Sequence, residues 1–203
     1  MRISILGTGD MGGAIATALS RRTAHQIGIR GSRPGSESTA KLVAALGVTE
    51  ATDDDIARSD VAFVVVPASA IPEALAPLAD FRGIVVSVAV SPSVGQDGLP
   101  SSAQRIAAAL PDAKVVNAFT SIWSTVVRNP GSGERTSVFV CSDHDDAKAA
   151  VFEIAKAVGF EAINGGKLAM AIYAEALGMF AVRLALDSGY GKTITFRAFN
   201  AIT

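Results

Sequence analysis

The sequence opens with a short apolar run that leads directly into a glycine-rich turn. Residues 2–6 (RISIL) are followed by residues 7–12 (GTGDMG). Met11, Ile15 and Leu19 then recur at four-residue spacing, which predicts an amphipathic helix that begins at the turn. A strand that passes into a helix through Gly-x-Gly-x-x-Gly is the arrangement that binds the pyrophosphate of a dinucleotide. The start of the chain therefore favours a nucleotide-binding α/β fold.

Each glycine of the motif has a mechanical reason. Gly7 permits a tight turn out of the strand, Gly9 lets the backbone approach a pyrophosphate, and Gly12 lets the helix pack closely on the strand. The free N–H groups and the positive dipole end of the helix then receive the phosphates. The alternative is an ordinary glycine-rich turn, and the position of the motif between a strand and a helix argues against it.

Further along, short runs rich in valine and isoleucine alternate with helical patterns. Residues 61–66 (VAFVVV) have no polar alternation, which is typical of a central parallel strand that is covered on both faces. The alternation predicts a Rossmann-type α/β fold with a doubly wound, mainly parallel sheet. Further strands are expected at residues 26–30, 84–90, 114–118, 137–141 and 160–164, and helices near residues 42–46, 71–78, 102–110 and 151–158.

The end of the second strand indicates which dinucleotide fits. NAD-specific enzymes usually place an acid there to hold the ribose 2′-hydroxyl. Here residues 29–33 read IRGSR, without an acid. Because Arg33 can form charge-assisted bonds to a 2′-phosphate and Ser32 can donate another, we predict NADP(H) as the cofactor. The alternative is a solvated loop arginine, and Glu37 nearby argues mildly against a strongly cationic pocket.

Composition and charge argue against several other function classes. The 203 residues carry 18 Lys and Arg against 19 Asp and Glu, and a net charge of −1 disfavours a nucleic-acid partner. Cys141 is the only cysteine, so no intramolecular disulfide can form, and a reducing compartment is favoured. The first residues lack the features of a signal peptide. We expect a cytoplasmic protein without a membrane partner.

The last long apolar segment runs from Leu168 to Leu186 and is interrupted by Glu175 and Arg183. A spanning helix needs about 20 mostly apolar residues without unpaired charges, so we expect a buried helix instead. No repeat or linker divides the chain. We predict an NADP-binding Rossmann domain over residues 1–165 and a C-terminal helical extension over residues 166–203.

No catalytic or metal-binding set stands out in the sequence. His25 is expected at the turn before a strand, and His144 in an exposed acidic turn. Residues 53–55 (DDD) are expected to begin a solvated helix rather than hold a metal, and Cys141 is expected in the core. Hydride transfer between two ring cofactors needs no protein nucleophile, because the cofactors carry the chemistry. We therefore expect no catalytic side chain and no metal.

The loops after the strands should line the pocket of the hydride acceptor, since ligands of this fold bind at the carboxyl ends of the strands. These loops hold Pro67 and Ala68, Ala89 and Val90, and residues 119–123. Trp123, the only tryptophan, can either stack on a flat acceptor ring or pack in the core. The predicted acceptor pocket consists of Phe119, Thr120, Ile122 and Trp123.

Several segments, in order along the chain, resemble one known family. They are GTGDMG, the GSR after the second strand, VVP, IVVSVAVSP, VVNAF and CSDHDD. From Met1 to about Gly191 they resemble the NADPH-dependent reductases of coenzyme F420, and the fold also resembles the soluble domain of the six-transmembrane ferric reductases. The resemblance implies pyrophosphate binding by residues 8–11, a nicotinamide path along Ala89, and a deazaflavin near residues 119–123. The predicted cofactor-binding residues are Gly7, Thr8, Gly9, Asp10, Met11, Gly12, Ser32, Arg33, Pro67, Ala68 and Ala89.

The same resemblance leaves the acceptor open. F420-specific members often carry His or Asn where this chain has Thr120, and a proline near Trp123. NADP(H) is still expected, whereas the small-molecule acceptor can be coenzyme F420, a flavin, a quinone or another small oxidant. Family members are commonly dimers, which implies a homodimer with the helix at residues 168–186 as the subunit contact.

Two other functions stay open. The N-terminal segment also resembles pyrroline-carboxylate reductase and the β-hydroxyacid dehydrogenases, which reduce imines or act on hydroxyacids. Those families add a long helical domain for the substrate, whereas about one helix of chain remains here after the Rossmann unit. A non-catalytic NADPH-sensing protein would need the binding turn alone. The favoured expectation is an NADP-dependent oxidoreductase with a deazaflavin, flavin-like or other small acceptor.

Overall fold

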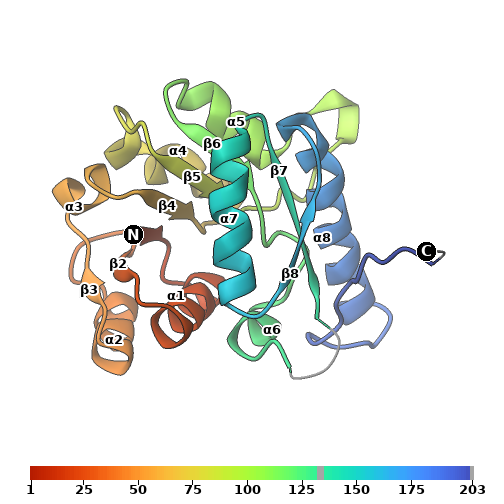
Figure 1. The fold of residues 1–203 in the computed structure, drawn as a ribbon, viewed down its shortest axis with the longest axis horizontal. Helices are drawn as coiled ribbons and strands as arrows, with labels where there is room; N and C mark the ends of the chain where they lie inside the picture. Colours follow the sequence, from red (N-terminus) through yellow and green to blue (C-terminus); the bar gives the residue numbers. More distant parts are fainter. Residues whose placement is uncertain (132–134, 202–203) are drawn as a thin grey trace.

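The computed structural model describes residues 1–131 and 135–201. An eight-stranded sheet with the order β3-β2-β1-β4-β5-β6-β7-β8 runs through its centre (Figure 1). Neighbouring strands are parallel except β6 and β7, which pair antiparallel. This is the doubly wound, mainly parallel Rossmann-type sheet that the sequence predicts. The strands are β1 (Arg2–Leu6), β2 (Gln26–Arg30), β3 (Thr49–Glu50), β4 (Val61–Val64), β5 (Ile84–Ser87), β6 (Lys114–Asn117), β7 (Ser137–Ser142) and β8 (Glu161–Asn164).

The strand order reverses beside β1. This strand lies between β2 and β4, so the chain builds one half of the sheet through β2 and β3 and then crosses to the other side. The two connections leave the sheet in opposite directions at the carboxyl ends of β1 and β4. In open α/β sheets that point is the crevice where ligands bind. The topology therefore places the ligand site next to the glycine-rich turn.

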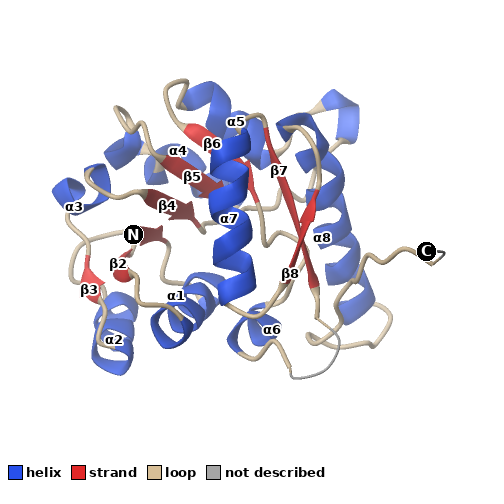
Figure 2. Ribbon diagram, in the orientation of Figure 1, coloured by secondary structure: helices blue, strands red, loops and turns tan. Residues whose placement is uncertain are grey.

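Helices cover both faces of the sheet (Figure 2). On one face, Ile15 of the first helix and Ile154 of the seventh join the core formed by Ile3, Phe63 and their neighbours. The opposite face is covered by the third, fourth, fifth and eighth helices, which contribute to a second core cluster. The helices are α1 (Asp10–Arg22), α2 (Glu37–Leu46), α3 (Asp53–Ala57), α4 (Ile71–Ala74), α5 (Ser102–Ala109), α6 (Ser124–Arg128), α7 (Asp145–Ala157) and α8 (Ala171–Leu186).

Local capping explains where several helices begin and end. Ser36 accepts a hydrogen bond from the Thr39 N–H at the start of α2, and Gly47 closes that helix in the left-handed conformation at φ 67°. Thr52 and Asp55 form a reciprocal capping box at the start of α3. The acidic run at residues 53–55 is thus the first turn of a helix, as predicted.

Some expected elements are shorter than the apolar runs that predicted them. The strand expected over residues 84–90 ends at Ser87, and the strand expected over residues 61–66 ends at Val64. The helix expected over residues 71–78 breaks into α4 and a 3₁₀ turn at Ala76–Leu78, because Pro77 has no N–H to continue α4. The runs past each strand end belong to loops that line the crevice.

The last helix corrects one prediction, since α8 is not a buried helix. Its inner face is buried through small residues and Glu175, whereas Tyr173 and Phe180 on the outer face keep 68% and 54% of their surface exposed. By length and composition alone, Leu168–Leu186 is apolar enough to cross a membrane. In the fold only one side of this helix packs on the rest of the molecule, against the start of α5 and the loops after β5 and β6. The prediction failed because the apolar composition of a helix does not reveal how many of its faces are covered by the rest of the protein.

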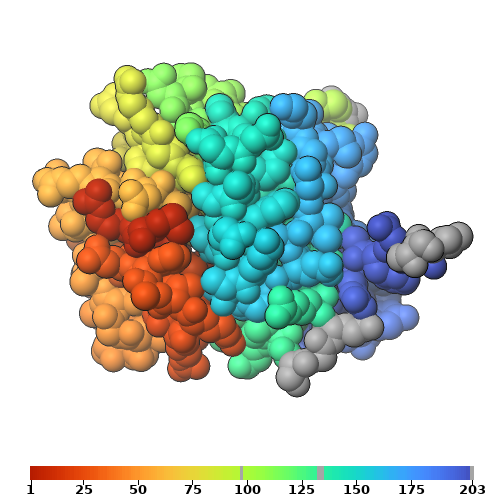
Figure 3. Space-filling view, viewed as in Figure 1, coloured from red at the N-terminus to blue at the C-terminus, as the bar shows by residue number. Residues whose placement is uncertain are grey.

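The N-terminal and C-terminal halves pack into one body. Figure 3 shows α7 running between the red and orange N-terminal elements and the blue C-terminal ones. The crevice at β1 and β4 is lined both by the opening turn and by residues of α8, which are more than a hundred residues away in the chain.

Candidate functional site

The glycine-rich turn has the geometry that its motif predicts. The Gly7 N–H donates to the Arg30 carbonyl at 2.8 Å, and Gly7 has φ 122°. A Cβ atom at Gly7 would lie 2.1 Å from the Val65 carbonyl oxygen, and one at Gly12 would lie 1.9 Å from the Gly7 carbonyl oxygen. At Gly9, by contrast, an added Cβ meets no described atom within 4 Å. Gly7 and Gly12 are thus required by packing, whereas the open space at Gly9 is left for something outside the chain.

Two pockets lie on either side of this turn. The first, which we call the β2 pocket, has a volume of about 340 Å³ and extends to the end of β2, with Thr8 and Ser32 in its lining. The second, the α8 pocket, has a volume of about 470 Å³ and lies between the turn and α8. Four residues line both pockets: Gly9, Val65, Val66 and Pro67. The pockets therefore form one continuous surface that crosses the turn and the end of β4.

The α8 pocket brings together most of the residues predicted for the acceptor side. Ala89 and Val90 from the β5 loop line it, as do all the predicted acceptor residues, Phe119, Thr120, Ile122 and Trp123. Asp10 and Met11 line it from the head of α1. The loops after β4, β5 and β6 thus converge as parallel-strand topology requires.

Phe119 has an unusual backbone in this loop. Its φ is 61°, in the left-handed region, which costs about 1–3 kcal/mol for a non-glycine residue. The ring packs inward against Phe63 and Phe160, with centroid separations of 6.3 and 6.0 Å. This burial holds the strained backbone in place and turns the following residues toward the pocket. Thr120 and Ile122 are buried beside it.

Trp123 lies at the edge of the core and in the wall of the α8 pocket, and its stacking on an acceptor ring stays a prediction. Its side chain packs against the core cluster and also lines the α8 pocket. The indole Nε1 is buried without a hydrogen-bond partner among the described residues. An unpaired buried donor is costly, so a polar atom bound in the pocket would be a favourable partner for it.

The carboxylate of Asp10 is held by α6. The Ser124 hydroxyl donates to Asp10, and Arg128 Nη2 lies 2.6 Å from Asp10 Oδ1 while also donating to the Asp10 carbonyl at 2.8 Å. The hydrogen bond from Ser124 and those from Arg128 lower the pKa of Asp10. Because the Arg128 guanidinium balances the charge of Asp10, the N-terminus of α1 can still accept an anion. Sequence reasoning missed Ser124 and Arg128, which lie more than a hundred residues from the turn.

The β2 pocket holds only part of the predicted 2′-phosphate site. Ser32 lines it, whereas Arg33 is exposed on the loop before α2 and lies outside the lining of both pockets. Arg30 lines the pocket, but its Nη1 lies 2.7 Å from Asp53 Oδ1 and donates to the Ala51 carbonyl. Arg33 therefore stays a prediction. Ala68, in the 3₁₀ turn after β4, also lies outside both linings.

Helix α8 supplies a wall that the sequence did not predict. Gly178, Met179, Ala181 and Val182 line the α8 pocket. A Cβ at Gly178 would lie 2.3 Å from the Thr120 carbonyl oxygen, so only glycine allows α8 to approach the loop this closely. A glycine in the middle of an apolar helical run was the available signal for such an approach.

Glu175 fixes this helix in place. It is fully buried, and its carboxylate accepts hydrogen bonds from the backbone N–H groups of Ser102 at 3.0 Å, Ala103 at 3.2 Å and Ser91 at 3.4 Å. Burial raises the pKa of Glu175, and the bonds from the backbone oppose that shift. The carboxylate thus joins α8 to the start of α5 and to the loop after β5.

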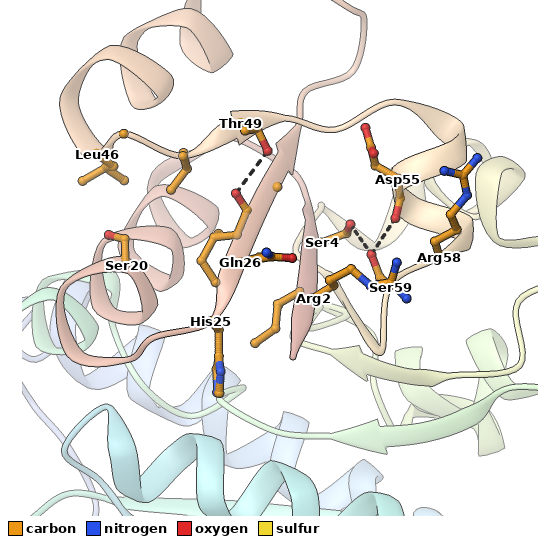
Figure 4. Close-up of a pocket in the computed structure, with 15 residues that line it drawn as sticks. Arg2, Ser4, Ser20, His25, Gln26, Leu46, Thr49, Asp55, Arg58 and Ser59 are labelled. Carbon is orange, nitrogen blue, oxygen red and sulfur yellow. Dashed lines mark hydrogen bonds between the residues drawn. The ribbon is translucent and has the colours of Figure 1, made fainter.

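A further hollow lies at the opposite edge of the sheet. It has a volume of about 500 Å³ and is lined by residues at the amino ends of β1 and β2, including Arg2, Gln26 and His25 (Figure 4). Ser59 there bonds to the Ser4 hydroxyl at 2.6 Å and to the Asp55 carbonyl at 2.9 Å. Burial lowers the pKa of His25. This hollow is remote from the carboxyl strand ends, where ligands of this fold bind.

The remaining titratable candidates are not brought together with the crevice. Cys141 is buried, and burial raises the pKa of its thiol to about 11, so it is not a nucleophile at neutral pH. His144 is exposed at the start of α7. Among residues 1–131 and 135–201, no group of three or more His, Cys, Asp or Glu side chains could hold a metal ion.

The fold and the glycine-rich turn define a protein of the Rossmann-type nucleotide-binding class. Residues 2–91 match the family described as NADP oxidoreductase, coenzyme F420-dependent, so this segment of the chain is similar to that family. The resemblance expected from the sequence is thus confirmed. The matched segment contains the glycine-rich turn, the end of β2 and the β5 loop.

Proteins with known sequences or structures are similar to this chain over most of its length. The metalloreductase STEAP3 of Rattus norvegicus is 30% identical over 180 residues, which cover 87% of this chain and 36% of that protein. The chain thus spans about a third of that relative's length. A crystal structure described as an F420-dependent NADP-reductase from Arthrobacter sp. FB24 superposes with a TM-score of 0.86 at 24% identity, and covers 98% of this chain and 100% of that one.

Other solved structures share the fold at greater distance. The hypothetical protein SMa0349 from Sinorhizobium meliloti has a TM-score of 0.71 at 25% identity, covering 84% of this chain and 87% of that one. A pyrroline-5-carboxylate reductase from Streptococcus pyogenes has a TM-score of 0.61 at 19% identity, covering 81% of this chain and 57% of that one. The match thus spans little more than half the length of that reductase.

Proposed function

We propose that this protein transfers a hydride between NADP(H) and a flat, small-molecule acceptor such as coenzyme F420 or a flavin. The observation that carries the proposal is the continuous surface formed by the β2 pocket and the α8 pocket, which meet at Gly9 and at the end of β4. A dinucleotide has two halves joined by a pyrophosphate, and the pockets have the matching arrangement on either side of the phosphate-binding turn.

The residues present fit the proposed cofactor. Residues 7–12 hold the pyrophosphate, and the space at Gly9 lets it approach the backbone. Ser32 and Arg33 bind the 2′-phosphate from the end of β2, with Pro67 and Ala68 beside the nucleotide at the end of β4. Ala89 lies along the path to the acceptor. When bound, NADPH would supply the hydride, which explains why no side chain is assigned a catalytic role.

The α8 pocket supports a second, planar ligand. Its lining combines apolar residues of α8 with Trp123 and the buried loop after β6, so it would exclude water and align a ring next to the cofactor. A protein that only senses NADPH would not need such a wall. An imine or hydroxyacid reductase is the alternative enzyme, and the acceptor assay below distinguishes it from a flavin-like reductase.

Cofactor binding can be tested at the turn. We expect calorimetry to detect NADPH binding by the wild-type protein. Gly9→Ala should fold normally but bind NADPH at least about tenfold more weakly, because its methyl group meets open space in the free protein and the pyrophosphate in the complex. Gly12→Ala is the packing control and should lower stability by about 1–3 kcal/mol, because its Cβ clashes with Gly7. Absence of any NADPH uptake by the wild type would refute the proposal.

Acceptor chemistry can be tested with NADPH oxidation in the presence of coenzyme F420, FMN or menadione, followed by absorbance. Turnover with F420 or FMN is the expected result. Binding of NADPH without turnover of any of the three would favour the sensor instead, and turnover with a cyclic imine alone would favour the imine reductases.

We further propose that residues 1–165 act as the NADP-binding domain and that residues 166–203 form the extension through which the chain makes a homodimer. The exposed apolar side chains on α8, with Tyr173 and Phe180 the largest, support a subunit contact there. Such a dimer would work in the cytoplasm without a membrane partner.

A further inference from the structure

The chain turns back after α8 and is anchored along its return path. The N–H groups of Tyr190 and Gly191 donate to the Leu184 and Ala185 carbonyls at 3.2 and 3.3 Å, which closes the helix. The returning segment then reaches the start of β7, where the Ser137 N–H donates to the Phe196 carbonyl at 3.0 Å. Figure 1 shows this dark blue segment leaving the lower end of α8 and passing near α6.

This path places Lys192 at the rim of the α8 pocket. The Thr125 hydroxyl of α6 donates to the Lys192 carbonyl. The Lys192 ammonium lies 5.8 Å from the centroid of the Trp123 ring, which lines the pocket. An ammonium at this distance interacts favourably with the face of an indole, and this holds the exposed side chain near the ring.

The charged residues around the rim leave the Lys192 ammonium available for a bound anion. The carboxylate of Asp10, which also lines the α8 pocket, is already bound by Arg128 and Ser124. The positive charge of Lys192 also lowers the pKa of Asp10, but less than Ser124 and Arg128 do. Lys192 thus acts on Asp10 through its charge and not through a hydrogen bond. Among the residues that the structure describes, Lys192 forms no ion pair. This cation at the pocket rim is therefore not paired with any carboxylate of residues 1–131 or 135–201.

We propose that Lys192 binds an anionic group on the hydride acceptor, so that the site selects planar acceptors that carry a phosphate or carboxylate over neutral ones. The inference rests on the proposed function and deepens it by naming the class of acceptor. A charge-assisted hydrogen bond from an ammonium to a phosphate is stronger than a neutral one. The ring would occupy the apolar pocket beside Trp123 while its anionic group projects to the rim.

FMN and riboflavin form a matched pair of probes, because they share the isoalloxazine ring and differ by one phosphate. Trp123 is the only tryptophan, so quenching of its fluorescence reports flavin binding without requiring turnover. With NADP⁺ present, we expect the wild type to bind FMN about tenfold more tightly than riboflavin. Lys192→Ala should remove this preference through weaker FMN binding, with the riboflavin affinity changed less than about twofold.

Two further variants serve as controls. Lys192→Arg should keep most of the preference for FMN, because it keeps the charge. Lys156→Ala, which removes an exposed lysine paired with Glu153 on α7, should behave as the wild type. Equal affinity of the wild type for the two flavins, binding of neither, or equal losses for both in Lys192→Ala would overturn the inference.

Calorimetry with NADPH alone separates this inference from the proposed function. Unchanged NADPH binding with no preference for FMN would overturn only the role of Lys192. If the wild type binds no NADPH, the proposed function itself is overturned.

Discussion

Individual side chains around the turn act through partners that are distant in sequence. Asp10 begins α1, where an acid is favourable to the helix dipole but would oppose a bound pyrophosphate. Arg128 and Ser124 hold that carboxylate and Arg128 balances its charge. The same helix, α6, follows directly from Trp123, so one short segment supports both the turn and the α8 pocket.

At this scale, the preference for NADPH over NADH should depend on Arg33. Its guanidinium is exposed on the loop after β2, whereas Arg30 is engaged by Asp53 and Ala51. Arg33→Ala should weaken NADPH binding by about 2 kcal/mol, roughly thirtyfold, and leave NADH within about twofold, because only NADPH carries the 2′-phosphate. Calorimetry with both nucleotides measures the difference.

The matched control is Arg82→Ala, which removes an exposed arginine paired with Asp112 near the start of β5. It should leave both affinities unchanged. Equal losses of NADPH and NADH in Arg33→Ala would show that Arg33 does not contact the 2′-phosphate.

Residue types alone predicted the turn because each glycine has a local reason that a motif records. They did not predict the left-handed backbone of Phe119, since this strain is held by the rings of Phe63 and Phe160. Nor could they assign Ser124, Arg128 or Lys192 to the site. Those assignments depend on contacts between segments that are distant in the chain.

Among the elements, α8 is tied to α5 and to the loop after β5 by a buried carboxylate. Glu175 accepts hydrogen bonds from the first N–H groups of α5, where a negative charge is favoured by the helix dipole. Burial nevertheless raises the pKa of this carboxyl above its ordinary value of 4.5, since the ion loses its water. The hydrogen bonds that attach α8 to α5 and to the loop after β5 therefore depend on the protonation state of Glu175.

This shift predicts a pH dependence of stability with a definite sign. Above pH 4.5 the folded state still holds a proton that the unfolded state releases, so the contribution of Glu175 to stability falls as pH rises toward its folded pKa. The free energy of unfolding of the wild type, relative to that of Glu175→Gln, should therefore decrease between pH 4 and pH 7. Urea denaturation at each pH measures it.

Glu153→Gln is the control for this series, because Glu153 is an exposed glutamate that pairs with Lys156 on α7. Its difference from the wild type should stay small throughout the range. A difference between wild type and Glu175→Gln that does not change with pH would contradict a raised pKa.

At the scale of the whole molecule, much of the outer face of α8 is exposed among the described residues. Phe180 is 54% exposed and stacks on Phe196 at a centroid distance of 6.3 Å, and Tyr173 is 68% exposed on the same helix. Burial of each such side chain in a dimer would contribute about 1.5–3 kcal/mol. The wild type should be a dimer in size-exclusion chromatography with light scattering, and Phe180→Glu should be a monomer.

Ala149→Glu provides the comparison, because it places the same charge at an exposed position on α7. This variant should remain dimeric. A monomeric wild type would contradict the proposed homodimer, and a dimeric Phe180→Glu would place the subunit contact elsewhere.

The sequence by itself determined the fold class, the position of most strands and helices, and the phosphate-binding turn. These features depend on local patterns: hydrophobic periodicity, capping residues such as Ser36, and glycines whose backbone demands are met within a few residues. The tertiary structure alone decided that α8 buries one face and forms a wall of the pocket, that Arg128 balances Asp10, and that Lys192 reaches Trp123. The physical reason is that burial and ion pairing depend on which distant segments meet, and no local pattern specifies this.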